Sequence, residues 1–382
     1  MKVAGLFAGI GGVELGLSRA GHESVLLCEN DPAAQAVLRH RWPETPLLGD
    51  VRTLRKLPSG TELLTAGFPC QDLSQAGQTK GITGKNSGLV SEVFRLLSKC
   101  EVPNVLLENV PFILALNKGE AMGILTRQFE RLGYKWAYRV VDSRSFDLPQ
   151  RRQRFFLFAS KQFVPEQLLF ADDDPPEEER RWSGRACGFY WTEGVRGLGW
   201  AVDATPPLKG GSTIGIPSPP AIWLPSGDVV TPDIRDAERL QGFPANWTRP
   251  ATKVTRESTR WKLVGNAVSV PVAKWFGGLL AGKQKQLPLN TSYFERTKKW
   301  PDASFGSMGN EPQRVYVSMF PKKPKYTPLA DFLRFQPKPL SYRATAGFIS
   351  RLASGNLHFP QEFLEALTLH REKMSAKERR AA

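Results

Sequence analysis

The sequence is poor in the residues that cross-link small proteins or hold metal ions. Its 382 residues include only four cysteines and four histidines. The cysteines stand at positions 28, 70, 100 and 187 and form no C-x-x-C pair, so the pattern predicts neither a zinc site nor a disulfide scaffold. We therefore expect no bound metal, and reduced thiols as they occur in the cytosol.

Long apolar runs are also missing. No uninterrupted apolar stretch approaches the ~20 residues that span a bilayer, and the first residues lack the charged and apolar regions of a signal peptide. The apolar fraction of 41% is typical of a globular protein. These features predict a cytoplasmic protein with no membrane partner.

Acidic residues are too few to balance the basic ones. Lys and Arg number 52 against 37 Asp and Glu, which gives a net charge of +15 and an isoelectric point near 9.8. Such an excess favours a polyanionic partner and salt-sensitive binding. From Lys283 onward there are 18 basic and 8 acidic residues, so the last quarter of the chain carries most of the excess.

Residues 1 to about 160 alternate between short β-like runs and amphipathic helical stretches, which is typical of an α/β sheet. In the second helix, Asp31-Pro32 predicts an N-cap followed by the first helical residue. The texture changes after Lys161: a charged, proline-interrupted stretch precedes a region rich in Gly, Pro and Trp. That region predicts a second domain of short strands and long loops. Strands are expected at 2–7, 24–29, 63–66, 104–108, 135–141 and 154–158, and helices at 13–20, 32–41, 88–99, 122–132, 268–281, 343–353 and 361–374.

A glycine-rich turn, Phe7-Ala8-Gly9-Ile10-Gly11-Gly12, joins the first strand to the first helix. Glycines let a ligand approach the backbone, and a helix N-terminus offers free N–H groups. Glu29 ends the second strand, where an acidic group conventionally accepts a ribose hydroxyl, and Asp50 ends a third strand, where it could accept an adenine amino group. A dinucleotide such as NAD, or a turn without ligand, is the alternative. The bunched G-x-G-G spacing fits S-adenosylmethionine better than a pyrophosphate.

Further motifs follow the strands. Cys70, in G-F-P-C-Q, places a thiol in the loop after a central strand, where open α/β sheets bind ligands, so it is a candidate nucleophile, although a lone cysteine is more often packing. Glu108 ends another strand in E-N-V. Arg152 and Arg154, two residues apart in Q-R-R-Q-R, project to one side of a strand. A surface carboxylate and a solvated basic turn are the alternatives for these two motifs.

Taken together, in this order and at this spacing, the motifs resemble those of the cytosine-C5 DNA methyltransferases of the prokaryotic modification type. The resemblance covers about residues 3 to 282 and includes R-L-Q-G-F-P at 239–244 and G-N-A-V at 265–268. It implies a doubly wound, Rossmann-like α/β methyltransferase domain at 1–168 that residues 260–282 complete. It also implies a smaller, loop-rich target-recognition domain with a hinge at 169–259, and leaves a basic C-terminal extension at 283–382.

The resemblance also assigns roles to residues. Cys70 would add to carbon 6 of a flipped-out cytosine, Glu108 would act at ring N3, Arg154 would hold the base oxygen O2, and Arg152 would orient the base or its phosphate. Gly5 departs from the family, which often has Asp or Ser there, so we expect one polar contact near the cofactor to be lost. The cofactor is S-adenosylmethionine, and its contacts would be Phe7, Gly9, Gly11, Gly12, Glu29, Asp50, Pro69, Leu89 and Asn266.

The implied function is methyl transfer from S-adenosylmethionine to carbon 5 of cytosine in a specific sequence of double-stranded DNA. The resemblance further implies a cytoplasmic, nucleoid-associated monomer within a restriction-modification system, with a cognate restriction endonuclease as its counterpart. A tRNA cytosine-C5 methyltransferase is one alternative, and a catalytically silent DNA-binding relative is another. An oxidoreductase binding NAD would account for the glycine-rich turn only.

Overall fold

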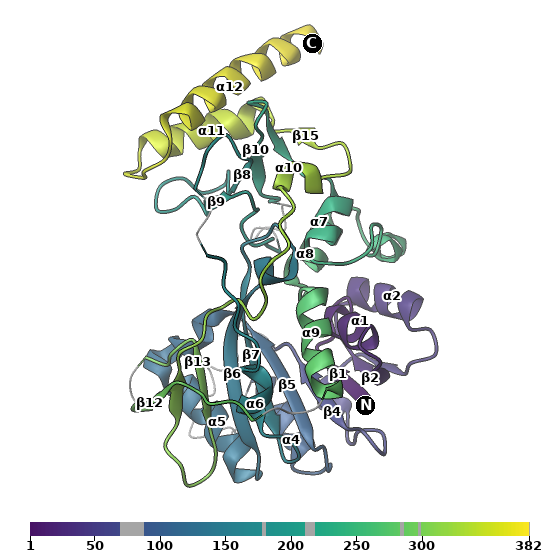
Figure 1. Ribbon diagram of the computed structural model, residues 1–382. Coiled ribbons are helices and arrows are strands. Elements are labelled where there is room, and N and C mark those ends of the chain that lie inside the picture. The colour runs from purple at the N-terminus through teal and green to yellow at the C-terminus, as the bar shows by residue number, and fades with distance from the viewer. Residues whose placement is uncertain (69–87, 178–180, 211–217, 283–285, 297–298, 382) are drawn as a thin grey trace. The chain divides into compact units, whose positions relative to one another are not determined.

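The computed structural model describes residues 1–68, 88–177, 181–210, 218–282, 286–296 and 299–381. The chain divides into two compact units (Figure 1). Unit 1 comprises Met1–Phe146, Gln153–Pro176 and Ala267–Lys323, and unit 2 comprises Asp147–Arg152, Glu177–Asn266 and Pro324–Ala382. Each unit is therefore assembled from three separate stretches of chain.

Unit 1 is built on one large mixed sheet, which the described residues form in the order β12-β14-β13-β6-β7-β5-β4-β1-β2-β3. The strands from β5 to β3 in this order run parallel to one another, whereas β7 pairs antiparallel with both β5 and β6. The strands are β1 (Lys2–Leu6), β2 (Glu23–Cys28), β3 (Leu47–Leu48), β4 (Leu63–Ala66), β5 (Asn104–Asn109), β6 (Lys135–Asp142), β7 (Gln153–Ser160), β12 (Thr291–Tyr293), β13 (Ala303–Gly306) and β14 (Gln313–Val315).

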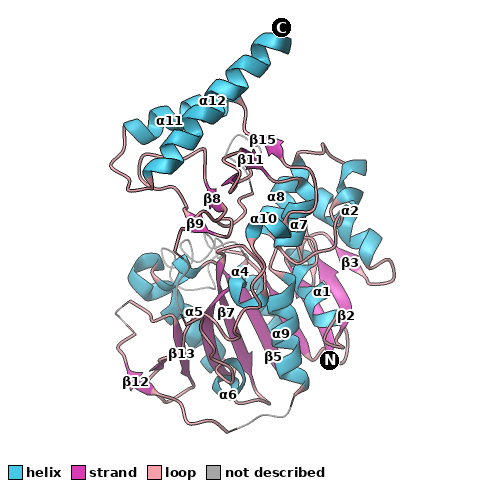
Figure 2. Cartoon of the chain, turned by 45° about the horizontal axis from the view of Figure 1, so that its top comes forward, coloured by secondary structure: helices cyan, strands magenta, loops and turns pink. Residues whose placement is uncertain are grey.

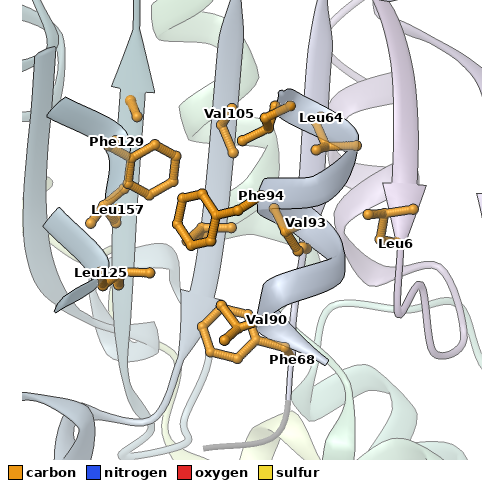
Figure 3. Packing of buried hydrophobic residues seen from close by; sticks show 14 of the residues in the cluster. Leu6, Leu64, Phe68, Val90, Val93, Phe94, Val105, Leu125, Phe129 and Leu157 are labelled. Carbon is orange, nitrogen blue, oxygen red and sulfur yellow. The ribbon is translucent and has the colours of Figure 1, made fainter. Parts of the chain in front are cut away.

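Helices cover both faces of this sheet, as the expected doubly wound fold requires. On β5, Val105 and Leu107 belong to one buried cluster and Leu106 to another, because alternate side chains of a strand point to opposite faces. The first cluster includes Phe94 of α4 and Phe129 of α5, whose rings meet edge to face at 5.0 Å (Figure 3). The helices of unit 1 are α1 (Gly12–Ser18), α2 (Pro32–Arg41), α4 (Val90–Leu97), α5 (Glu120–Arg131), α6 (Pro165–Leu169) and α9 (Val270–Ala281).

The second cluster joins α9 to α1, so the chain does return to the large domain after the small one. A Cβ atom added at Gly16 of α1 would lie 2.5 Å from the Cβ of Ala273, and His22 Nε2 donates a 2.9 Å hydrogen bond to the Gly277 carbonyl. The return begins at residue 267, whereas residues 260–266 belong to unit 2. α9 also lies within Thr259–Ala281, which is long and apolar enough to span a bilayer. However, 72% of the most apolar window of this stretch is buried inside the protein, as in the core helix of a globular protein.

The residues beyond 283 were expected to form one basic extension, but in the structure they divide between the two units. β13 extends the large sheet by pairing antiparallel with β6. The ring of Trp300 packs 6.0 Å from that of Trp136 and 6.1 Å from that of Tyr138, both on β6. Trp300 and β13 are therefore part of the core of unit 1 rather than of an appendage.

Unit 2 contains a smaller sheet in the order β15-β11-β10-β8-β9, with helices packed on it (Figure 2). Its core is aromatic: the ring of Phe189 lies 5.0 Å from that of Phe348 and 4.9 Å from that of Phe363. The end of the chain thus supplies the core of the small unit. The elements of unit 2 are β8 (Cys187–Phe189), β9 (Ala201–Val202), β10 (Ala221–Trp223), β11 (Val229–Thr231), β15 (Lys338–Pro339), α7 (Ile234–Leu240), α8 (Thr259–Asn266), α10 (Leu329–Phe332), α11 (Tyr342–Ala353) and α12 (Gln361–Ala381).

Candidate active site

The glycine-rich turn after β1 has the backbone that the sequence predicted for a ligand cradle. Phe7, Gly9 and Gly11 all have positive φ, at 54°, 55° and 80°, and Gly11 is the N-cap of α1. A Cβ atom at Gly9 would meet no atom within 4 Å, whereas one at Gly11 would lie 2.4 Å from the ring of Trp42. The turn is therefore open to a ligand at Gly9 and closely packed behind Gly11.

Glu29, one residue beyond β2, is held against this turn. Its Oε2 accepts a hydrogen bond from the Gly9 N–H at 2.8 Å, and its Oε1 accepts one from the Asp31 N–H at 2.8 Å. A carboxylate has about four acceptor positions, so the two backbone donors leave room for hydroxyl groups of a ligand. Glu29 and the open turn at Gly9 fit the ribose and backbone contacts that an adenosine-bearing cofactor such as S-adenosylmethionine needs.

Asp50 lies two residues beyond β3 and caps a single 3-10 turn. Its Oδ1 accepts hydrogen bonds from the backbone and the side chain of Arg52, at 2.9 and 3.1 Å. The backbone bond from Arg52 and its side-chain bond hold the pKa of Asp50 below its ordinary value. The carboxylate is thus ionised, exposed and fixed in direction, as an acceptor for a purine amino group would be.

A buried carboxyl group beside β1, next to the glycine-rich turn, was not singled out from the sequence. Glu14, in the first turn of α1, is 1% exposed, and burial, with a smaller contribution from the negative charge of Glu29, raises its pKa to about 7. A Cβ atom at Gly5 would lie 2.3 Å from its Oε1. The carboxyl group of Glu14 therefore occupies the space beside Gly5, and it fits there because glycine has no side chain.

Two of the four predicted catalytic residues, Glu108 and Arg154, lie together where β5 ends and β7 begins. Glu108, near the end of β5, lies 3.2 Å from Arg154 Nε through its Oε1, and a Cβ atom at Gly67, just after β4, would lie 3.4 Å from its Oε2. Asn109 Nδ2 donates a 2.9 Å hydrogen bond to the carbonyl of Phe68. The carboxylate, the guanidinium and the start of the G-F-P-C-Q loop therefore share one edge of the sheet.

The other expected site residues are more dispersed. Pro69 and Cys70 lie outside the described residues. Leu89 is the N-cap of α4 and packs against the buried cluster of that face. Arg152 belongs to unit 2, where it is 1% exposed and its Nη1 lies 3.4 Å from the Leu208 carbonyl oxygen, and Asn266 ends α8 in the same unit. Arg152 and Arg154, expected to project to one side of a strand, thus belong to different units.

The R-L-Q-G-F-P motif has a structural role that the sequence did not assign. Gln150 is fully buried in unit 2, and its Nε2 donates to the carbonyl of Leu240 at 2.8 Å and to Oε1 of Gln241 at 3.2 Å. Gln241 in turn donates to the Val264 carbonyl at 2.9 Å. These hydrogen bonds join Q-R-R-Q-R, R-L-Q-G-F-P and the residue before G-N-A-V. The glutamine in each of the first two motifs was the sequence feature that could have indicated this contact.

Two of the described thiols, Cys28 and Cys187, are poor nucleophiles. Burial raises the pKa of Cys28 to about 11 and that of Cys187 to about 12, and a thiol needs to be ionised to attack. Cys100 is half-buried, and its sulfur accepts a hydrogen bond from the Leu57 N–H at 3.4 Å. Within the described residues no cluster of three or more His, Cys, Asp or Glu side chains could hold a metal ion.

Comparison with known proteins identifies the family. The profile of the family described as C-5 cytosine-specific DNA methylase matches residues 1–182. The Type II methyltransferase M2.BsuMI of Bacillus subtilis (strain 168) is 47% identical over 384 residues, covering 96% of this chain and 97% of that protein. The chain belongs to the C-5 cytosine-specific DNA methylase family. M.DsaV of Dactylococcopsis salina, also a Type II methyltransferase, is 27% identical over 72% of this methylase and 84% of its own length.

A solved structure agrees on the fold. The Dnmt2 methyltransferase of S. pombe matches the methylase with a TM-score of 0.55 at 18% identity, covering 73% of this chain and 98% of that one. The predicted Rossmann-like methyltransferase fold and the predicted family are confirmed. The methylase uses S-adenosylmethionine to methylate carbon 5 of cytosine in DNA, and the relatives support DNA rather than the tRNA alternative.

Proposed function

We propose that Cys70 is the nucleophile of this methylase and that Glu108 and Arg154 stabilise the cytosine ring that it attacks. The observation that carries the proposal is the pairing of Glu108 with Arg154 at 3.2 Å beside Gly67. Cys70 follows Gly67 by three residues in the sequence. Of the thiols that the structure describes, Cys28 and Cys187 are buried with raised pKa values, and Cys100 lies at the N–H of Leu57.

Carbon 5 of cytosine is too electron-poor to accept a methyl group unaided. Addition of the Cys70 thiolate at carbon 6 makes the ring an enamine and places negative charge on N3 and O2. Glu108 would hold a proton or hydrogen bond at N3, and the Arg154 guanidinium would compensate the charge at O2. Once carbon 5 carries the methyl group, loss of its proton restores the double bond between carbons 5 and 6 and releases the thiolate of Cys70.

The cofactor turn supplies the second half of the site. S-adenosylmethionine, when bound, supplies the electrophilic methyl group. Gly9 and Gly11 would admit it to the backbone, Phe7, Gly12 and Leu89 would line it, and Glu29 would accept its ribose hydroxyls. Asp50 would accept its adenine amino group, and Pro69 and Asn266 would complete the contacts.

Unit 2 would recognise the DNA. A base in a duplex is out of reach of a thiol, so the target cytosine must be flipped out, and Arg152 would orient it or its phosphate. We assign target recognition to the described parts of 177–266 together with residues 324–381. The methylase would act as a cytoplasmic, nucleoid-associated monomer and would protect its recognition sequence from a cognate restriction endonuclease, as the Type II names of its relatives suggest.

A trapping experiment tests the nucleophile. Duplex DNA with 5-fluorocytosine at the target site keeps carbon 5 from losing a proton, so the bond to the enzyme persists once the methyl group has been transferred. Wild-type methylase with S-adenosylmethionine should form an adduct that survives denaturing electrophoresis, and peptide mass analysis should locate it at Cys70. Bisulfite sequencing of DNA from expressing cells identifies the target to be used.

Matched substitutions make the result specific. Cys70→Ala should abolish both the adduct and methyl transfer, whereas Cys100→Ala should retain both. Glu108→Gln should lower the rate of transfer by about 10²–10³-fold, the size typical of losing one stabilising group. An adduct at any other cysteine, or normal turnover by Cys70→Ala, contradicts the proposal.

A further inference from the structure

The last helix, α12, borders a cavity in unit 2 for which the methylase chemistry has no use. The cavity has a volume of about 620 Å³, which is within the range of ligand pockets. Its walls come from three stretches of unit 2: the β10–β11 turn, the segment around β15, and the C-terminal half of α12. α12 packs beside β11 (Figure 2).

The rim of this cavity is basic. Lys373, Lys377 and Arg380 line it at spacings of four and three residues, which place them on one face of the helix. Asp228 is the one acidic residue of the lining. Lys373 already neutralises this carboxylate: its Nζ donates to Asp228 Oδ1 at 2.8 Å and holds the pKa of the carboxyl below its ordinary value.

Two positive charges therefore remain without a counter-charge. Among the described residues, neither Lys377 nor Arg380 makes a hydrogen bond or an ion pair, and both side chains are exposed. Like charges one turn apart on a helix repel each other, so their placement on one face is unfavourable unless an anion binds there. Apolar side chains line the rest of the cavity, among them Leu224, Val230 and Met374.

A buried histidine fixes this helix to the sheet. His370 is 4% exposed, and its Nε2 hydrogen-bonds to the carbonyl of Leu340 at 2.8 Å. Its Nδ1 is buried and has no hydrogen-bond partner within the described residues. The basic side chains therefore belong to a helix that is anchored next to β15 through the His370–Leu340 hydrogen bond.

We propose that the cavity bounded by Lys377, Arg380 and β15 is a second DNA contact that binds phosphates of the duplex backbone outside the target base pairs. The proposal rests on the DNA-binding function of the methylase. Basic side chains supply the attraction to phosphate, and the apolar walls suit the deoxyribose between two phosphates. Base sequence plays no part in this contact, because phosphates carry no sequence information.

The test uses full-length protein and a 30-base-pair duplex without a target site, so that its outcome does not depend on catalysis. Binding is measured by fluorescence anisotropy between 50 and 300 mM KCl. The double variant Lys377→Ala/Arg380→Ala should lower the slope of log affinity against log salt by about 2, since each phosphate contact contributes about 0.9. Its affinity at 100 mM KCl should fall at least tenfold.

A matched double variant on the opposite face of α12 serves as the control. Arg371→Ala/Arg379→Ala removes the same charge from residues that do not line the cavity, so its slope should change by less than about 0.5. Circular dichroism of both variants verifies that α12 is retained. Equal slopes for the two variants would overturn the proposal and leave the cavity to another anion, such as an acidic protein segment. Methyl transfer on target DNA, measured separately, reports on the proposed function itself.

Discussion

Replacing Glu14 with glutamine should stabilise the methylase in alkaline solution and not in acid. The side chain is 1% exposed, its pKa is raised by burial from 4.5 to about 7, and its Oε2 has no hydrogen-bond partner among the described residues. In the unfolded chain the carboxyl loses its proton near its ordinary pKa. Between these two values the folded protein holds a proton that the unfolded protein has lost, so the free energy of unfolding falls as the pH rises.

The magnitude follows from the shift. A difference of about 2.5 pKa units at about 1.4 kcal/mol per unit corresponds to roughly 3 kcal/mol lost by pH 8.5 relative to pH 4. Glutamine has no charge to bury, and its amide oxygen can accept the hydrogen bond that Thr65 makes to the carboxyl. Glu14→Gln should therefore exceed the wild type by up to about 3 kcal/mol at pH 8.5 and match it near pH 4, below the ordinary pKa of the carboxyl.

Urea unfolding monitored by circular dichroism at pH 4, 5, 6, 7 and 8.5, at one ionic strength, measures this difference. Glu120→Gln is the control, because Glu120 occupies the first turn of α5 but is exposed, and its curve should run parallel to that of the wild type. The reasoning fails if the gap between Glu14→Gln and wild type is the same at every pH.

Two further outcomes follow from the packing. Gly11→Ala would place a methyl group 2.4 Å from the Trp42 ring at a φ of 80°, so in urea unfolding its free energy of unfolding should fall by more than the ~1 kcal/mol of a left-handed residue. Gly9→Ala, at a φ of 55° with open space around it, should lose only about 1 kcal/mol of stability but should weaken S-adenosylhomocysteine binding in calorimetry, because its methyl group enters the ligand space; equal losses of stability would contradict this account. Truncation after residue 282 should give insoluble protein, because both units lose core residues, and a soluble, folded product in a centrifugation assay would refute it.

The sequence predicted well what local signals specify. The helix at 32–41 was placed correctly because Asp31 caps it, with Oδ1 accepting from the Ala33 N–H at 2.8 Å. The Glu108–Arg154 contact was also predictable. Glu108 lies at the end of β5 and Arg154 at the beginning of β7, and these two buried strands pair in the sheet. The order of the strand ends therefore predicted that these two side chains meet, whereas their catalytic roles stay a prediction.

Long-range pairing was not predictable in the same way. β12, β13 and β14 have three or four residues each, too short for an alternating pattern, and β13 is specified by its pairing with β6, some 165 residues earlier in the chain. α12 was expected to end near Met374 but continues to Ala381, because its last two turns carry no apolar periodicity that would reveal them. The contact between Glu14 and Gly5 likewise depends on how α1 packs against β1. The local sequence of either element does not predict that packing.

The interleaving of the two units limits how target specificity could be exchanged between relatives. Exchanging residues 177–266 alone would separate Phe189 from Phe348 and Phe363, the rings it packs against. A chimera that keeps its recognition unit intact would have to transplant 147–152, 177–266 and 324–382 as a set. Recombination in this lineage should therefore favour replacement of whole genes over shuffling of central cassettes.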